Sequence, residues 1–387
     1  MIRSPHITFA DRTCFRTVTE AQEVADLIAV LLDGARAGDG DAMPDSIKLE
    51  SLSGGRSGAH VFRIVSSQAR DHTCAVAPAV LKIATRDAGI AEQRNYERFV
   101  RPLLPPSCRP DLLAFASKGG RAALLYSLLG NGERPVTLTD RLLAGDAVAL
   151  DSVLSSLIDT LWRCWYHPTI ARDQSDLSRY YLHRYFGDLS AASAAERVLF
   201  EHAARYFGLQ RCAEGYRVGD ARFPNLTRTL FASGPREHVS CVVHGDLNSD
   251  NVVLAADAGG GQLVDFQRVG RGHALQDLVT LEASVRINHP VSMTFNEILY
   301  LERQMAFGRP EIQSPHATAI AKIRVVARQF FGALESPGNH HLAVGAVGLR
   351  LMRATDLSDA ARASIIASAL WSAKALSDAE TATPPTS

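Results

Sequence analysis

The chain has 387 residues, of which 46% are hydrophobic and 21% charged, enough for a large core in one or two domains. Its 41 basic residues equal its 41 acidic ones, so there is no basic excess to favour nucleic-acid binding. The six cysteines show no zinc or disulfide spacing, the N-terminus lacks the apolar core of a secretory signal, and no apolar run reaches the roughly 18 residues that span a bilayer. We expect a cytoplasmic protein without a membrane or nucleic-acid partner.

The first third of the chain predicts a helix, a linker and a small mixed lobe. Apolar residues at helical spacing over 19–36 end in a stretch rich in Gly, Asp and Pro, so we assign residues 1–45 to an N-terminal helix and linker. Five short β-like runs follow, with a helix near 88–103 between the third and the fourth. The expected strands cover residues 47–53, 60–65, 78–84, 112–117 and 121–127. We assign residues 46–135 to this lobe.

From about residue 136 the chain is predicted to be mostly helical. Long Leu/Ala/Arg-rich segments indicate helices, and the clear strand signals in this half are "CVVHG", "NVVLAA" and "GQLVDF". We assign residues 136–375 to a helical lobe and 376–387 to a disordered tail. Histidines 289, 340 and 341 are expected at the surface. The predicted fold class is therefore α+β, with a small β-rich N-terminal lobe and a larger helical C-terminal lobe.

Polar side chains are crowded between two of these strand signals. "HGDLNSDN" places Asp246 and Asn251 five residues apart, and "LVDF" places Asp265 at the end of the next strand. Phosphoryl transfer needs a carboxylate to orient an acceptor hydroxyl, and an amide oxygen with a second carboxylate to hold Mg²⁺. Single Asp and Asn residues mostly cap turns, but the combination favours phosphoryl transfer.

These residues carry a resemblance to known families. "VVHGDLNSDNVVL" followed by "LVDFQRVGRGHALQDL" resembles the aminoglycoside phosphotransferase and choline kinase families, whose pattern is H-G-D-x-x-x-x-N, an Asp before an aromatic residue, and a Gly-rich turn ending in D-L. The resemblance implies a two-lobed protein-kinase-like fold, ATP and Mg²⁺. It implies Asp246 as the catalytic base, and Asn251 and Asp265 as Mg²⁺ ligands. It further implies that His244 supports the catalytic loop and that Asp277 is a buried brace beneath it.

The N-terminal lobe contains further residues that such a fold needs. "SGGRSGA" lies between the first two predicted strands, and its backbone N–H groups are candidates for phosphate binding at Gly54, Gly55, Ser57 and Gly58. A Gly-Gly turn that merely closes a hairpin is the alternative. Lys82, in the third strand, is the candidate for binding the α- and β-phosphates, unless it only reaches solvent from an edge strand.

Two assignments in this lobe leave alternatives open. Either Glu92 or Glu97 could pair with Lys82 from the following helix, and the E-x-x-N-Y pattern of the resembling sequences favours Glu92. Leu125, Tyr126 and Ser127 correspond to the hinge that pairs with adenine in those families. An ordinary strand end fits these three residues equally well.

Other features bear on the branch and the reaction. Gln267 stands where protein kinases have the Gly of D-F-G, which favours small-molecule kinases. "GGRSGA", "NYERFV", "LLYSL", "WYHP" and "DFQRVGRGHALQDLVTLEASVR" together resemble a bacterial branch called ternary complex-associated domains, found in conflict or signalling systems. We expect γ-phosphoryl transfer from ATP to a hydroxyl of an unidentified, small-molecule acceptor. The alternatives are a nucleotide-binding regulatory module with little or no transfer, and a transferase acting on a protein or nucleotide.

Overall fold

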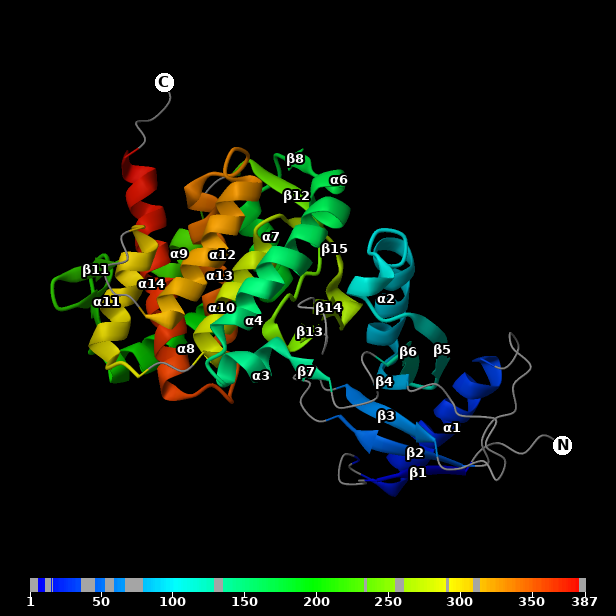
Figure 1. Ribbon diagram of the computed structural model, residues 1–387. Coiled ribbons are helices and arrows are strands. Elements are labelled where there is room, and N and C mark those ends of the chain that lie inside the picture. The colour runs from blue at the N-terminus through cyan, green and yellow to red at the C-terminus, as the bar shows by residue number, and fades with distance from the viewer. Residues whose placement is uncertain are drawn as a thin grey trace. The chain divides into compact units, whose positions relative to one another are not determined.

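The computed structural model describes most of the chain, and its residues divide into two units (Figure 1). Unit 1 comprises residues 1–136 and 250–270, and unit 2 comprises residues 137–249 and 271–387. The described residues are 6–10, 15, 17–35, 46–52, 59–66, 79–128, 135–232, 235–254, 261–289, 292–308 and 314–382.

Unit 1 is built on a six-stranded sheet with the strand order β1-β2-β3-β4-β6-β5. β1 pairs parallel with β2, and the other neighbours are antiparallel. The strands are β1 (His6–Phe9), β2 (Ser46–Ser51), β3 (His60–Ser66), β4 (Ala79–Thr85), β5 (Leu112–Lys118) and β6 (Arg121–Ser127). The five strands predicted from the sequence are all present, whereas the short strand β1 was not predicted.

The N-terminal helix is part of unit 1. α1 (Val18–Ala35) begins after Thr17, whose Oγ1 accepts a hydrogen bond from Glu20 N at 3.1 Å. It packs against β5 and β6 (Figure 1), and its buried apolar residues join one core with those of the sheet. The helix residues of this core are Val24, Leu27, Ile28, Leu31 and Leu32. The structure thus differs from the expectation that residues 1–45 form a helix and linker ahead of the lobe, because β1 extends the sheet and α1 covers it.

α2 (Arg86–Asn95) connects β4 to the rest of unit 1 and continues as a π-helical turn over Tyr96–Val100. It lies so close to β6 that a Cβ at Gly89 would be 2.4 Å from the Cβ of Ala122. A 3₁₀ turn over Pro106–Cys108 precedes β5. Unit 1 also contains the antiparallel hairpin of β13 (Val252–Leu254) and β14 (Gly261–Leu263), followed by a 3₁₀ turn over Phe266–Arg268.

Unit 2 is mainly helical, as the sequence predicts. β7 (Val136–Thr137) stands at the chain junction of the two units, and α3 (Leu138–Leu143) follows it. The next helical stretch runs through α4 (Ala147–Ser152), the π-helical turn Val153–Ile158, α5 (Asp159–Leu161), the π-helical turn Trp162–Tyr166 and α6 (His167–Thr169). The remaining helices are α7 (Leu177–Tyr185), α8 (Leu189–Phe207), α9 (Leu226–Phe231), α10 (Gln276–Asn288), α11 (Phe295–Ala306), α12 (Pro315–Phe331), α13 (Pro337–Leu351) and α14 (Asp359–Ala382).

Short strands complete unit 2. β12 (His238–Val243) pairs with β8 (Ala171–Asp173), and β15 (Gly270–His273) lies on its other side. β9 (Gln210–Cys212), β10 (Gly215–Val218) and β11 (Ala221–Phe223) form a separate three-stranded sheet that the sequence did not predict. Every residue of β12 is buried, so the segment that follows it starts from a fixed point in the core.

α14 packs against several other helices of unit 2 (Figure 1). Its buried face is rich in alanine, and a Cβ at Gly348 of α13 would lie 2.9 Å from the Cβ of Ala369. The small residues let α13 and α14 approach closely. The predicted disordered tail at 376–387 is wrong for its first part, because α14 continues to Ala382 with Leu376 fully buried; residues 383–387 lie outside the described part.

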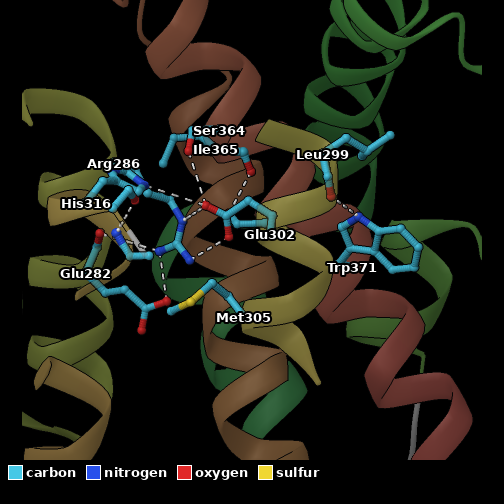
Figure 2. Close-up of polar contacts among 12 residues, drawn as sticks. Glu282, Arg286, Leu299, Glu302, Met305, His316, Ser364, Ile365 and Trp371 are labelled. Carbon is cyan, nitrogen blue, oxygen red and sulfur yellow. Dashed lines mark hydrogen bonds and ion pairs between the residues drawn. The ribbon is translucent and has the colours of Figure 1, made fainter. Parts of the chain in front are cut away.

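Four charged residues link α10, α11 and α12, and Figure 2 shows three of them, Glu282, Arg286 and Glu302. This charge network consists of Glu282 and Arg286 on α10, Glu302 on α11 and Arg324 on α12. Arg286 donates to Glu302 from Nε at 2.8 Å and from Nη2 at 2.9 Å, and its Nη1 lies 2.8 Å from Glu282 Oε1. Arg324 donates to Glu282 from Nη2 at 2.6 Å and from Nε at 3.1 Å. Two cations therefore balance two carboxylates inside the helical unit.

The network holds its carboxylates ionised. Burial alone would raise the pKa of Glu302, but Arg286 and His316 outweigh it and lower that pKa to about 2. Burial likewise opposes ionisation of Glu282, yet Arg324 and Arg286 lower its pKa well below the usual range. His340 Nε2 lies 3.4 Å from Glu282 Oε2, and His289 is buried. The prediction that these two histidines are surface residues is therefore wrong.

Candidate active site

In unit 1, Lys82 lies between two carboxylates. Its Nζ donates to Glu92 Oε2 at 2.7 Å and to Asp265 Oδ1 at 2.8 Å. Lys82 comes from β4, Glu92 from α2, and Asp265 follows β14. The side chains of Lys82 and Glu92 are 8% and 1% exposed, whereas that of Asp265 is 28% exposed. One cation thus serves two carboxylates, and the outer carboxylate is accessible to solvent.

The protonation of this group follows from burial and charge. Burial would lower the pKa of the Lys82 ammonium, but Glu92 and Asp265 outweigh it and raise that pKa above its usual range. Burial raises the pKa of Glu92, against the opposing effect of Lys82. Burial and Glu92 also raise the pKa of Tyr126 well above its usual range, so the Tyr126 phenol stays protonated. Its O–H donates a hydrogen bond to Glu92 Oε1 at 2.9 Å.

Asp265 has an unusual backbone conformation. It is the only non-glycine residue with a positive φ in the described part of the chain, at φ 65° and ψ 72°. This left-handed conformation is uncommon for residues with a side chain, although Asp and Asn tolerate it best. Asn95 Nδ2 donates to Gln267 O at 2.8 Å, and Tyr96 packs edge-on against Phe266 at 5.6 Å between ring centroids. Contacts from the end of α2 and from the π-helical turn that follows it therefore hold the segment that carries Asp265.

Asn251 lies at the same end of the β13–β14 hairpin as Asp265. Val252 pairs with Leu263, and Val264 N donates to Asn251 O at 3.1 Å. The Asn251 side chain is 8% exposed. Antiparallel pairing thus brings together two oxygen-bearing side chains that are fourteen residues apart in the sequence.

In unit 2, Asp277 holds the loop that follows β12. Its Oδ2 accepts from His244 N at 2.7 Å and from the Tyr166 phenol at 3.0 Å, and its Oδ1 accepts from Gly245 N at 2.8 Å. Asp277 and His244 are both fully buried. Burial raises the pKa of Asp277, although His244 and the two backbone N–H groups oppose the rise. The three donors fix the backbone that leads to Asp246.

The same loop is held from its other side. Gly245 has φ 78°, a conformation that suits glycine, and its carbonyl oxygen accepts from Gln276 Nε2 at 2.9 Å and from Arg184 Nη2 at 3.2 Å. Asp246 Oδ1 accepts from Arg350 Nη2 at 3.1 Å. Asn248 N donates to Asp246 O at 2.7 Å, which makes Asn248 a turn residue. Asp246 is therefore a partly exposed carboxylate on a rigid loop.

The residues of unit 1 suit Mg²⁺ and a nucleotide. Among the described residues no group of three or more His, Cys, Asp or Glu side chains could hold a metal ion alone. Asn251 and Asp265 offer two hard oxygen donors, and Mg²⁺ commonly takes few protein ligands together with phosphate oxygens and water. Lys82 is buried beside Asp265 and carries a charge suited to phosphate. The donor set fits a Mg²⁺–nucleotide complex better than a metal ion held by protein ligands alone.

The structure resolves the choice of Lys82 partner geometrically. Glu92 contacts Lys82, whereas Glu97 is exposed and lies 3.1 Å from Arg101 Nη2. Glu92 follows the buried Gly89 by three residues, so both lie on the face of α2 that packs against the sheet. Glu97 lies in the π-helical turn that follows and points outward. The glycine-rich residues Gly54, Gly55, Ser57 and Gly58 lie outside the described residues.

The hinge candidates lie inside the sheet. Leu125 and Tyr126 pair with β4 on one side and β5 on the other, so their backbone groups belong to the two ladders. Ser127 N donates to Asp111 O at 2.9 Å, and Ser127 Oγ accepts from Asp111 N at 2.8 Å. The expectation that these backbones are available to adenine therefore needs correction for Leu125 and Tyr126. The Tyr126 side chain instead reaches Glu92.

Sequence reasoning missed two of these contacts. Arg350 lies 104 positions after Asp246, in a helix with no recognisable motif. The Tyr166 phenol reaches Asp277 across 111 positions. The lone lysine in an apolar strand pointed to the Lys82 group, but no comparable local signal marks a single arginine in an arginine-rich chain.

Comparison with known families agrees with the sequence motifs. The family model described as ternary complex associated domain 9 matches residues 46–199 and 197–334, most of the chain. The chain belongs to the ternary complex associated domain 9 family. The resemblance to the ternary complex-associated branch is thereby confirmed, and the elements described above confirm the α+β fold class. No curated protein matches the chain.

Solved structures similar to this ternary complex associated domain 9 member are distant in sequence. An aminoglycoside-3'-phosphotransferase of type VIII is 19% identical with a TM-score of 0.42, over 83% of this chain and 97% of that chain. A glucosamine kinase is 16% identical with a TM-score of 0.41, over 90% and 97% of the two chains. An ethanolamine kinase of Plasmodium vivax is 10% identical with a TM-score of 0.42, over 92% of this chain and 90% of that chain.

Among the described helices of the ternary complex associated domain 9 chain, none is long and apolar enough to cross a bilayer.

Proposed function

We propose that this chain is an ATP- and Mg²⁺-dependent phosphotransferase that transfers the γ-phosphoryl group to a hydroxyl of a small-molecule acceptor. The observation that carries the proposal is the contact of Lys82 with both Glu92 and Asp265. A buried lysine held by one carboxylate and shared with a second, more exposed one is suited to a ligand that brings both phosphate and metal ion. The rigid loop that carries Asp246 supports the same proposal from unit 2.

Each residue has a role in this proposal. Lys82, oriented by Glu92, would bind phosphate oxygens, while Asn251 and Asp265 would supply oxygen ligands to the metal ion. Mg²⁺, when bound, would neutralise phosphate charge and orient the phosphate oxygens. The glycine-rich segment 54–58 would cover the phosphates through its backbone N–H groups, and the chain around Ser127 would face the adenine.

Asp246 would act on the acceptor. Its carboxylate would accept a hydrogen bond from the acceptor hydroxyl and take its proton while the new O–P bond forms and the bond from the γ-phosphorus to the bridging oxygen breaks, releasing ADP. His244 and Asp277 touch neither substrate in this scheme. They would position Asp246 through the backbone hydrogen bonds of the loop.

The test combines binding with turnover. Mg²⁺–ATP at about 100 times its Kd should add roughly 2.7 kcal/mol to stability in a thermal-shift titration. Asp246→Asn should keep this stabilisation and lose about 10²-fold to 10⁴-fold in ADP formation with a panel of alcohol acceptors. Equal turnover of Asp246→Asn and parent would remove Asp246 from its role. Stabilisation of the parent without transfer to any acceptor would favour a nucleotide-binding regulatory module, and no stabilisation at all would refute the proposal.

A further inference from the structure

Two arginines from different helices of unit 2 contact the loop that carries Asp246. Arg350, near the end of α13, donates from Nη2 to Asp246 Oδ1 at 3.1 Å. Arg184, near the end of α7, donates from Nη2 to the carbonyl oxygen of the preceding residue, Gly245, at 3.2 Å. The chain segments that supply these arginines are far apart in the sequence, so tertiary packing brings two guanidinium groups to one short loop.

The position of Arg350 is well defined. Its guanidinium lies over the ring of Tyr185, with the Cζ atom 5.1 Å from the ring centroid. Stacking on an aromatic face suits the planar guanidinium group and limits its freedom. The side chains of Arg350 and Asp246 are each 23% exposed. The pair is therefore fixed in geometry and still accessible to a solute.

A purely structural role explains this pair poorly. In the charge network of α10, α11 and α12, the side chains of Glu282, Arg286 and Glu302 are each 1% exposed. The side chains of Arg350 and Asp246 are instead each 23% exposed, so solvent reaches their contact. Binding of the acceptor would explain why an arginine lies beside Asp246.

We propose that Arg350, with Arg184 beside it, selects an acceptor that carries an anionic phosphate or carboxylate group close to its reactive hydroxyl. Guanidinium groups bind both anions through paired, charge-assisted N–H donors. Two cations near the loop would disfavour an acceptor that carries ammonium groups. This inference rests on the proposed function in one respect, namely that Asp246 faces the acceptor.

The test uses four small alcohols that differ mainly in charge: glycerol 3-phosphate, glycerate, glycerol and choline. Their binding to the full chain is measured by calorimetric titration without nucleotide or Mg²⁺. We expect at least one of the two anions to bind at least tenfold more tightly than glycerol and choline. The comparison of phosphate with carboxylate identifies the preferred anion. Equal or tighter binding of glycerol or choline, or no binding of either anion, overturns the inference.

Matched variants assign the effect to one residue. Arg350→Met should lose at least tenfold in affinity for the preferred anion, and Arg350→Lys should retain part of it. Arg353→Met is the control, because Arg353 carries the same charge three positions later and donates to Tyr185 O at 3.0 Å instead of contacting Asp246. Urea unfolding of each variant verifies that it is folded. Anion affinity unchanged in Arg350→Met overturns the inference.

Failure of this inference can be separated from failure of the proposed function. Asp265→Asn, in unit 1, should retain anion binding even though it is expected to lose Mg²⁺-dependent activity. Anion selectivity without any stabilisation by Mg²⁺–ATP would retain the inferred site and reject the phosphotransferase. Stabilisation by Mg²⁺–ATP with transfer only to neutral or cationic alcohols would support the phosphotransferase and reject the inferred anion site.

Discussion

The two units each contain a buried group of charges, and the two groups are built differently. In unit 1, Lys82 contacts both Glu92 and Asp265, and the Asp265 side chain is 28% exposed. In unit 2, Arg286 contacts Glu282 and Glu302 (Figure 2), and Arg324 contacts Glu282. The side chains of both carboxylates are 1% exposed. A closed, balanced network is complete without a ligand. In unit 1, by contrast, one of the two carboxylates that contact Lys82 is partly exposed, so a ligand can reach it.

The largest expected effect is the loss of stability on breaking the balanced network. Arg286→Met removes the arginine that contacts the buried Glu302 and leaves the buried Glu282 with Arg324. Removing one member of a buried ion pair typically costs about 3–5 kcal/mol. All three tryptophans, Trp162, Trp165 and Trp371, lie in unit 2, so urea unfolding followed by tryptophan fluorescence should report this loss.

The control for this variant is the same substitution at an exposed pair of unit 2. Arg222 and Glu214 are 75% and 76% exposed and lie 3.2 Å apart. Arg222→Met should change stability by less than about 1 kcal/mol. Equal losses in the two variants would show that burial does not distinguish the two pairs.

Removing the partly exposed carboxylate of unit 1 should lower activity and leave the fold unchanged. Asp265→Asn keeps a residue that tolerates the left-handed backbone and leaves Lys82 paired with Glu92 alone. We expect a loss of stability of at most about 1 kcal/mol, because Asp265 is partly exposed, and a loss of roughly 10²-fold to 10³-fold in turnover. Urea unfolding and ADP formation measure the two quantities. Asp250→Asn, in the nearby turn, should change neither, and a turnover of Asp265→Asn equal to the parent would contradict the proposed metal site.

Acid should weaken the balanced network. Because the pKa of Glu302 is lowered to about 2 in the folded state, its stabilisation is present above its usual pKa near 4.5 and is lost as the pH falls from there toward 2. The loss from this group is about 3 kcal/mol. Glu92 has the opposite sign, since its raised pKa makes its ionised form less favourable on folding.

The pH effect can be measured with Glu302→Gln, which lacks the titrating group. Tryptophan fluorescence should show the variant less stable than the parent at neutral pH, with the difference shrinking as the pH falls below 4.5. A difference that stays constant down to the lowest pH at which both fold would assign the acid sensitivity to other residues.

The smallest expected effect concerns the phenol that holds Glu92. Tyr126→Phe removes the hydrogen bond to Glu92 Oε1, which is worth about 1 kcal/mol, or roughly fivefold in turnover if Glu92 orients Lys82. Tyr216→Phe is the matched control, because Tyr216 donates to Glu196 Oε1 at 2.8 Å in unit 2. It should lower the stability of unit 2 and leave turnover unchanged. Equal turnover in Tyr126→Phe and the parent would remove the phenol from that role.

Local patterns in the sequence predicted much of this structure. Strand periodicity located β2 to β6, and "HGDLNSDN" with "LVDF" marked Asp246, Asn251 and Asp265 because these residues lie in short, ordered segments. The strand β1 was missed because four residues carry little periodicity and its pairing depends on a partner forty positions away. The tail was misjudged because "AETA" looks polar, although the helix that precedes it is buried and extends its last turns to Ala382.

Contacts across long stretches of sequence could not be predicted. Arg350 meets Asp246, and Arg286 meets Glu302, only because helices of unit 2 pack in a particular order. The residues next to His340 in the sequence predict that it lies at the surface, yet its side chain faces Glu282. The choice of Glu92 over Glu97 likewise depends on which face of α2 touches the sheet, and the sequence alone favours Glu92 only through a family pattern.

The close contact between Gly89 and Ala122 predicts a pair of compensating substitutions. A methyl group at position 89 would lie 2.4 Å from the Cβ of Ala122, so Gly89→Ala would push α2 away from β6. Glu92 lies one helical turn further along α2, and its carboxylate would move with the helix. The substitution changes no charge, and Ala122→Gly in the same chain restores the lost space. The two positions therefore form a suppressor pair, in which the second mutation rescues the first through volume alone.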